Sequence, residues 1–250
     1  MVIAKLVDLT VDIAVRRGRR PERTRVLDTV RLDVAAGSVT ALIGESGCGK
    51  SLVAAALAGL LPPGSTVAGQ VIIDGVAVGH DDERRWRTLR GSRIGTVPQS
   101  AATSFTPVRT LGSQLAEICG RVGADRTPAE LCEIVALPAD TLTRYPHQLS
   151  GGMAQRAAIA AALAGRPALL LADEPTSALD PDNAATVWRL LGQAAADGAA
   201  VLVITHDVPS LRRAAVCTDI AVMAHGTVIE RLPLADAINS PDDHVSALLS

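Results

Sequence analysis

Aromatic side chains are scarce in this sequence of 250 residues, and the four that occur are Trp86, Phe105, Tyr145 and Trp188. The core must therefore be built from Leu, Val, Ile and Ala. With 48% hydrophobic and 20% charged residues, the chain can bury a substantial core, which excludes an intrinsically disordered protein. Its length suits one large domain or a core with an inserted lobe.

Cysteine, long apolar runs and net charge are also limited, and each shortage excludes a class of protein. The four cysteines are widely spaced without a C-x-x-C pair, which favours reduced cytosolic thiols over a zinc or iron–sulfur site. No run reaches the roughly 18 apolar residues that a membrane-spanning helix needs. Met1 to Thr10 alternates like a strand and carries Asp8, so we expect no signal peptide. A net charge of −2 gives no general attraction to nucleic acid or acidic lipid.

The motif GESGCGKS, Gly44 to Ser51, indicates a phosphate-binding turn. An apolar, β-rich run from Val39 to Ile43 precedes it, and an Ala- and Leu-rich segment from Lys50 to Leu61 predicts a helix after it. Glycines allow successive N–H groups to curl around an anion, and the helix directs its positive end toward that anion. The predicted nucleotide-binding residues here are Gly44, Glu45, Ser46, Gly47, Cys48, Gly49, Lys50, Ser51 and Leu52.

Two side chains of this motif have distinct predicted roles. Lys50 supplies a positive charge to the β- and γ-phosphates, and the hydroxyl of Ser51 binds Mg²⁺. The alternative is a chance match, which the flanking strand and helix make improbable. The sequence therefore predicts a site for a nucleoside triphosphate.

The segments before and after this motif predict a β-rich start of the chain. Met1 to Ala35 alternates around a polar tip, Arg16 to Arg25, which predicts an antiparallel hairpin. The six arginines of the tip either form a solvated loop or offer a surface to phosphate or a partner. Further on, the pattern predicts short strands at Val71 to Asp74 and Ile94 to Val97, with a helical piece at Asp81 to Leu89.

From Ser100 to Gln155 the pattern changes to short helices, such as Leu111 to Cys119 and Pro128 to Val135. After it, strands and helices alternate again: Leu169 to Ala172, Asn183 to Ala196, Val201 to Thr205, and a hairpin of Ile220 to Met223 with Thr227 to Glu230. This alternation predicts an α/β fold with a mostly parallel sheet and helices on both faces. We expect an ATP-binding core of residues 1–98 and 158–250, with residues 99–157 as an inserted helical subdomain.

Two acidic residues, Asp173 and Glu174, follow the apolar strand that begins at Ala168. The carboxyl end of such a strand faces the ligand crevice in open α/β sheets, and neighbouring strand residues point in opposite directions. We predict that Asp173 binds Mg²⁺ and that Glu174 polarises the water that attacks the γ-phosphate. The alternative is an exposed acidic turn before Pro175.

A second anion-binding element is predicted at LSGGMAQR, Leu149 to Arg156. Ser150 can cap a helix, and Gly151 and Gly152 allow close approach of the backbone. One nucleotide does not need two such anion-binding elements, so we infer that this second element binds the nucleotide of another subunit.

The order of GESGCGKS, Gln99, LSGGMAQR, LLLADEP, SALD and His206 resembles the nucleotide-binding subunit of ABC transporters over essentially the whole chain. The resemblance implies a P-loop NTPase (RecA-like) fold with an N-terminal antiparallel β part. It also implies an ATPase with ATP and Mg²⁺ as cofactors. Two subunits, identical or sister, would enclose two ATP molecules head to tail. The implied partners are transmembrane permease subunits and, indirectly, an extracytoplasmic solute-binding protein. The implied location is the cytoplasmic face of a bacterial-type cell membrane.

Three further residues take roles from this resemblance. Gln99 looks like the glutamine that senses Mg²⁺ and the attacking water, Asp180 like the aspartate of the loop that crosses the dimer interface, and His206 like the histidine that contacts the γ-phosphate. Their alternatives are a polar residue at a strand end, a helix cap before Pro181, and a histidine satisfied within a turn. The other histidines, His80, His147, His225 and His244, receive no catalytic role.

Finer resemblance is to peptide and nickel importers, carried by YPHQLSGGMAQR, DEPTSALDP, SFTPVRTLGSQLAE and the closing PDDHVSALLS. That closing segment lacks the usual aromatic partner of its histidine, and no cysteine-bearing tail follows, which favours the shorter nickel type. Family members usually stack adenine on an aromatic residue near the position of Ile13, whereas no aromatic occurs here before Trp86. We therefore predict modest ATP affinity and weak discrimination between ATP and GTP.

Three other functions are considered. An ABC exporter subunit is the nearest, because sequence separates the direction of transport poorly. A non-transport ABC ATPase acting on nucleic acid or ribosomes usually has paired domains, a coiled-coil insertion or basic tails, none of which occurs here. A regulatory module with little hydrolysis is disfavoured by the intact Glu174 and His206.

Overall fold

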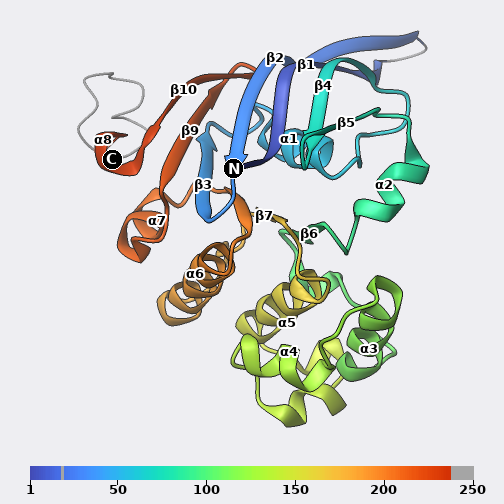
Figure 1. Cartoon of the computed structure of the whole chain (residues 1–250), viewed down its shortest axis with the longest axis vertical. Coiled ribbons are helices and arrows are strands. Elements are labelled where there is room, and N and C mark those ends of the chain that lie inside the picture. Colours follow the sequence, from blue (N-terminus) through green and yellow to red (C-terminus); the bar gives the residue numbers. More distant parts are fainter. Residues whose placement is uncertain (18–19, 238–250) are drawn as a thin grey trace.

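The computed structural model describes residues 1–17 and 20–237, which form two β-sheets and a group of helices that projects from them (Figure 1). Residues 18 and 19 of the arginine-rich tip and the closing PDDHVSALLS lie outside the described residues. Among the described helices, none has the length and apolar character needed to cross a membrane.

The smaller sheet is antiparallel, with strand order β2-β1-β4-β5. Its strands are β1 (Val2–Arg17), β2 (Arg20–Ala35), β4 (Thr66–Ile73) and β5 (Val76–Val78). The predicted N-terminal hairpin is confirmed, but its strands extend into the expected loop because Arg16 pairs with Pro21 and Arg17 with Arg20. β4 begins five residues earlier than predicted, at Thr66, because its mostly exposed first residues also pair with β1.

The larger sheet has the order β10-β9-β3-β8-β7-β6. Five of its strands are parallel: β9 (Asp219–Ala224), β3 (Ser38–Gly44), β8 (Ala200–Ile204), β7 (Leu169–Asp173) and β6 (Ile94–Val97). β10 (Thr227–Pro233) runs antiparallel to β9 at the edge. This arrangement confirms the predicted α/β fold with a mostly parallel sheet and an antiparallel β part.

Apolar side chains cover both faces of the larger sheet, because successive residues of a strand point to opposite sides. Leu42 of β3 packs in the core that contains the antiparallel sheet and helix α1 (Lys50–Leu57), whereas Ala41 and Ile43 pack in the core on the other face. That second core is closed by α5 (Gly151–Leu163), α6 (Pro181–Ala196) and α7 (Val208–Ala214). One tryptophan lies in each core, Trp86 in the first and Trp188 in the second.

Between β6 and β7 the described chain contains helices and no strand, and these helices gather at the end of the molecule opposite the antiparallel sheet (Figure 1). They are α3 (Leu111–Val122), α4 (Pro128–Ile134), three short 3-10 turns and α5. Thr110 caps α3, and Thr127 with Glu130 forms a capping box on α4. α5 contacts both α4 and β6, so it joins this helical region to the larger sheet.

Several helices differ from the sequence expectation. α1 ends at Leu57 rather than Leu61, because Gly59 adopts a φ of 64° and Pro62 and Pro63 follow. α2 (Glu83–Leu89) begins after Asp82, whose side chain accepts a hydrogen bond from the backbone N–H of Arg85. α7 was not predicted. The last short helix is α8 (Leu234–Ala237).

Candidate functional site

The turn between β3 and α1 has the conformation expected of a phosphate-binding loop. Gly47 and Gly49 adopt φ angles of 82° and 108°, in the left-handed region that glycine tolerates best. A side chain on Gly47 would meet open space, whereas a Cβ on Gly49 would lie 2.8 Å from Leu27 Cδ2 and 3.2 Å from the carbonyl oxygen of Val26. Gly47 is therefore needed for the shape of the turn, and Gly49 also for packing against β2.

Lys50 is held inside this turn by the backbone. Its Nζ donates hydrogen bonds of 2.7 Å to the carbonyl oxygens of Gly44 and Glu45, and it lies 3.8 Å from Cys48 Sγ. The residue is only 8% exposed. Its ammonium group is therefore positioned within the turn, where an anion bound by the N–H groups would meet it.

A cleft of about 330 Å³ opens beside this turn, within the usual size range of small-molecule sites. It gathers residues from the turn, from the segment after β6, from the end of β7 and from the end of β8. The lining residues are Ser46, Gly47, Gly49, Lys50, Ser51, Leu52, Gln99, Asp173, Glu174, Ile204 and His206. Side chains predicted from motifs more than 100 residues apart thus meet in one place, because the carboxyl ends of parallel strands share an edge.

Asp173, at the end of β7, has an unsatisfied buried oxygen. Its Oδ1 is buried without a hydrogen-bond partner. Burial raises the pKa of this carboxyl, and the neighbouring charge of Glu174 raises it further, while the Ser51 hydroxyl and the Lys50 charge act in the opposite direction. A bound cation would satisfy the oxygen and favour the ionised carboxylate.

The oxygen donors of Ser51, Gln99 and Asp173 fit Mg²⁺, which binds through one or two carboxylates together with water and substrate phosphates. The described residues hold no group of three or more His, Cys, Asp or Glu side chains that could bind a metal by themselves. Any Mg²⁺ here would therefore depend on the oxygens of a bound phosphate.

Glu174 and His206 form a hydrogen-bonded pair at the cleft. His206 Nδ1 lies 2.7 Å from Glu174 Oε1, and the side chain of Glu174 is 12% exposed while that of His206 is 70% exposed. Glu174 has a φ of 47°, which is rare for a non-glycine residue, and its N–H donates a 2.8 Å hydrogen bond to the carbonyl oxygen of Ile204. The backbone of β8 thus holds Glu174 in a strained conformation next to His206.

Several predicted site residues lie outside this cleft in the described chain. Ser150 caps α5 by accepting a hydrogen bond from the Met153 N–H at 3.2 Å, and Gly151 and Gly152 form the first turn of that helix. Asp180 caps α6, and Ile13 lies on β1 opposite Thr24. None of these residues lines the cleft. Within one chain, the cleft therefore contains the first predicted anion-binding element, the turn before α1, but not the second, at the start of α5.

The residues that support His206 were missed by the sequence interpretation. The Asp207 N–H donates to Thr205 Oγ1 at 3.0 Å, and Asp207 Oδ1 accepts from the Ser210 N–H at 3.0 Å, which caps α7. Ile204 of β8 also lines the cleft and was not predicted. Asp207 followed by Pro209 is a helix-start signal that would have revealed α7.

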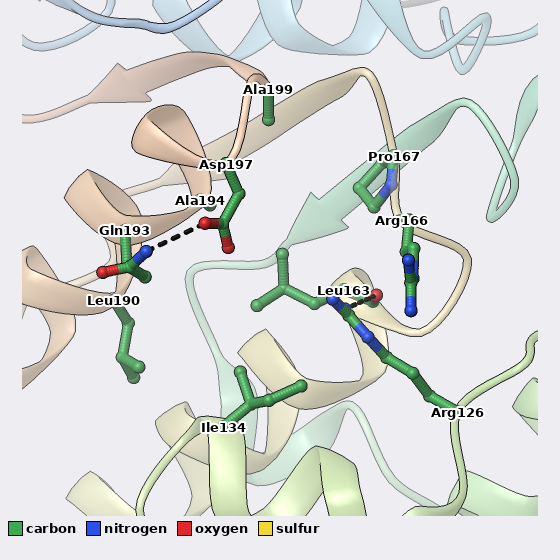
Figure 2. A pocket seen from close by; sticks show the side chains of 10 residues that line it. All are labelled: Arg126, Ile134, Leu163, Arg166, Pro167, Leu190, Gln193, Ala194, Asp197 and Ala199. Carbon is green, nitrogen blue, oxygen red and sulfur yellow. Dashed lines mark hydrogen bonds between the residues drawn. The ribbon is translucent and has the colours of Figure 1, made fainter.

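A separate cavity of about 400 Å³ lies where the helical region meets α6 (Figure 2). Arg126, Leu163 and Arg166 approach it from one side and Gln193 and Asp197 from the other. The Arg126 guanidinium donates a 3.0 Å hydrogen bond to the carbonyl oxygen of Leu163, and Gln193 Nε2 donates a 2.9 Å bond to Asp197 Oδ1. This cavity shares no lining residue with the phosphate-binding cleft.

The fold and the cleft together define an ATP-hydrolysing P-loop cassette. A family profile described as ABC transporter matches residues 27–177, and the chain belongs to this family. The predicted ABC ATPase is thereby confirmed.

Two relatives and one solved structure illustrate the similarity. The chain is 41% identical over 229 residues to the probable peptide ABC transporter ATP-binding protein y4tR of Sinorhizobium fredii, covering 87% of this chain and 68% of that protein. It is 35% identical over 233 residues to the nickel import ATP-binding protein NikD of Brucella abortus, covering 90% and 86%. A dimeric ATP-binding cassette in a post-hydrolysis state bound to ADP and Pi matches with a TM-score of 0.79 at 28% identity, covering 93% of this chain and 99% of that one.

Proposed function

We propose that this chain is the ATP-hydrolysing subunit of an importer, and that it energises uptake of a small solute of the peptide, nickel or metal-chelate class. The observation that carries the proposal is the cleft in which Lys50, Gln99, Asp173, Glu174 and His206 meet. The relatives named for peptide transport and nickel import support the substrate class. The chain would act at the cytoplasmic face of the membrane as a peripheral subunit of separate permease proteins.

The nucleotide site is completed by a second subunit in this proposal. Ser150, Gly151 and Gly152 lie outside the cleft of their own chain and present the capped start of α5. Backbone N–H groups at such a helix start bind phosphate well. The similar solved cassette is dimeric, which supports a head-to-tail pair in which these residues meet the γ-phosphate bound by the partner.

Hydrolysis in this proposal uses residues that already lie in the cleft. Lys50 would neutralise the β- and γ-phosphates, and Ser51, Gln99 and Asp173 would hold Mg²⁺, which supplies charge stabilisation to the phosphate oxygens. Glu174 uses Oε1 for His206, which leaves Oε2 to accept a proton from the attacking water. As the water oxygen bonds to the γ-phosphorus, the bond to the β-phosphate oxygen breaks and ADP leaves.

A groove of about 480 Å³ between the larger sheet and the helical region offers a place for the permease subunit. Pro98, directly before Gln99, lines it together with Phe105, Gln114 and Ile118. Arg109 and Arg121 form ion pairs with Glu117 along its rim. We infer that a cytoplasmic helix of the permease docks here, so that a movement of Gln99 at the nucleotide reaches the membrane.

The catalytic assignment is tested with Glu174→Gln. This variant should bind ATP as the unaltered chain does, hydrolyse it at least 100-fold more slowly, and elute as a dimer when ATP is present. Lys50→Ala is the control and should neither retain ATP nor dimerise. Rapid turnover by Glu174→Gln would remove Glu174 from its assigned role.

The transport assignment is tested by reconstitution with the permease subunits and the solute-binding protein. An importer accumulates solute in the compartment that contains this ATPase, and the binding protein stimulates ATP hydrolysis. Movement of solute in the opposite direction would identify an exporter. Co-purification with ribosomes or nucleic acid, without permease, would support the non-transport alternative.

A further inference from the structure

Gly152, in the first turn of α5, lies directly against the side chain of Asn183 in the first turn of α6. A Cβ built on Gly152 would overlap the carboxamide of Asn183, with Nδ2 only 2.8 Å away. Real Cβ atoms do not approach a neighbour this closely. A side chain on Gly152 therefore requires the Asn183 carboxamide to move, apart from any contact with phosphate.

The Asn183 carboxamide is also bonded to Asp180. Its Nδ2 donates a 2.6 Å hydrogen bond to Asp180 Oδ2, while Asp180 Oδ1 accepts from the N–H groups of Asp182 and Asn183 at 3.1 and 3.0 Å. An added methyl group on Gly152 could be accommodated only if the carboxamide swung away. That movement would break its bond to Asp180 but leave the backbone cap of α6 intact.

Gly151 provides a contrast within the same turn. The one atom within 4 Å of a Cβ built there is Leu179 Cδ2, at 3.9 Å, which is an ordinary van der Waals contact. A methyl group on Gly151 therefore fits within the chain. The two adjacent glycines therefore have different neighbours, although the sequence motif gives no sign of a difference between them.

We propose that Asn183 is a positioning residue, which fixes the Ser150–Gly152 turn to Asp180 so that both parts approach the second subunit as one rigid surface. The Ser150 hydroxyl caps α5, the Asp180 carboxylate caps α6, and the Asn183 carboxamide touches both helix starts. The proposal deepens the proposed function and rests on it, because the surface matters only if a second subunit binds there.

The intrachain contact is tested by thermal unfolding of the full nucleotide-free chain. Gly152→Ala should lower the unfolding midpoint by about 5 °C, and adding Asn183→Ala should restore most of that loss because it removes the obstructing carboxamide. Gly151→Ala is the matched control and should leave the midpoint unchanged or raise it. If the double variant is no more stable than Gly152→Ala, or if both glycine variants behave alike, the contact does not have this role.

The positioning role is tested by ATP-dependent dimerisation in the Glu174→Gln background. Asn183→Ala should leave ATP affinity of the monomer unchanged but raise the dimer dissociation constant roughly tenfold. Asn183→Asp, which has the same shape but places a second carboxylate beside Asp180, should weaken the dimer at least as much. Dimerisation equal to that of Glu174→Gln alone would overturn the role of Asn183. Failure of Glu174→Gln itself to dimerise would instead contradict the proposed function. The unfolding experiment would still show whether Gly152 and Asn183 are in contact as described.

Discussion

Asp173 destabilises the nucleotide-free chain in a way that a bound cation would relieve. Its Oδ1 is buried without a partner, and burial raises the pKa of the carboxyl. A carboxyl whose pKa is raised by folding stabilises the folded state while it keeps its proton. That contribution is fully present below 3.8, the ordinary pKa of this carboxyl in the unfolded chain. It is lost as the pH rises through the higher pKa that the carboxyl has in the folded chain. Above that folded pKa, the folded chain carries the full cost of the buried charge.

We predict that Asp173→Asn stabilises the nucleotide-free chain at neutral pH by on the order of 1 kcal/mol, because it removes the buried charge. The same change should abolish the stabilisation that Mg²⁺ and ATP together provide. Denaturant unfolding at pH 4 and pH 7, with and without Mg-ATP, checks both effects, and the gain should shrink at the lower pH. The exposed Asp125→Asn is the control, and an equal effect there would refute the prediction.

Ile13 allows a gain-of-function prediction. It is a partly buried aliphatic residue on β1. The resemblance to the family leads us to expect an adenine-stacking aromatic residue near this position. Ile13→Tyr should raise ATP affinity roughly fivefold, by about 1 kcal/mol, because an aromatic ring stacks on adenine. Competition between ATP and GTP should also become more selective. Titration of both nucleotides decides this, and unchanged affinities would show that adenine is not near this strand.

At the scale of elements, α5 depends on a residue from outside its own sequence. Its last turn contains no basic residue, and Arg126, from the segment before α4, donates to the carbonyl oxygen of Leu163 on one side of the cavity in Figure 2. A cation at this end of a helix compensates the partial negative charge of the unpaired carbonyl groups. Arg126 thus joins the segment before α4 to the end of α5, the helix that contacts the larger sheet.

We predict that Arg126→Ala lowers the free energy of unfolding by about 1 kcal/mol, which corresponds to roughly 2–4 °C in the unfolding midpoint. ATP affinity should not change, because Arg126 does not line the phosphate-binding cleft. Calorimetry and nucleotide titration give the two readouts. Arg84→Ala, at an exposed position of α2, serves as the comparison and should have a smaller effect on stability.

Elements with a strong local pattern were predictable from sequence, and those imposed by neighbours were not. The apolar runs of β3, β7 and β8 lie between helices on both faces, so their burial is visible in the sequence. The first half of β4 is mostly exposed and contains Gly69, and it is a strand only because β1 pairs with it. The early end of α1 also depends on a tertiary contact, since the Trp86 ring packs where a side chain on Gly59 would stand.

For the whole molecule, motif order predicted that five separated side chains would meet in one cleft, but not how they are supported. Motif order placed Lys50, Gln99, Asp173, Glu174 and His206 together, and all five line one cleft. The strained backbone of Glu174, its bond to His206 and the carbonyl bonds of Lys50 could not be read from motifs, because they depend on side-chain and backbone conformation. The contact between Gly152 and Asn183 was hidden for the same reason.

Gln99 gives a prediction for the complete transporter. It lines the nucleotide cleft, and its neighbour Pro98 lines the groove proposed for the permease. Gln99→Ala should reduce transport at least tenfold more than it reduces ATP affinity, because it disconnects the two sites. Solute uptake and ATP binding measured in the same reconstituted vesicles check this. Equal losses in both would mean that Gln99 acts only as a ligand.

The placement of one tryptophan on each side of the larger sheet supplies two natural fluorophores that report on different layers. Trp86 donates its indole N–H to the Gly79 carbonyl oxygen at 2.9 Å, and Trp188 donates to Ser210 Oγ at 2.9 Å. Replacing either tryptophan with phenylalanine leaves a single tryptophan, whose emission can be excited selectively. Spectra of the two variants would therefore follow the β-rich layer and the helix-covered layer separately while the protein binds nucleotide.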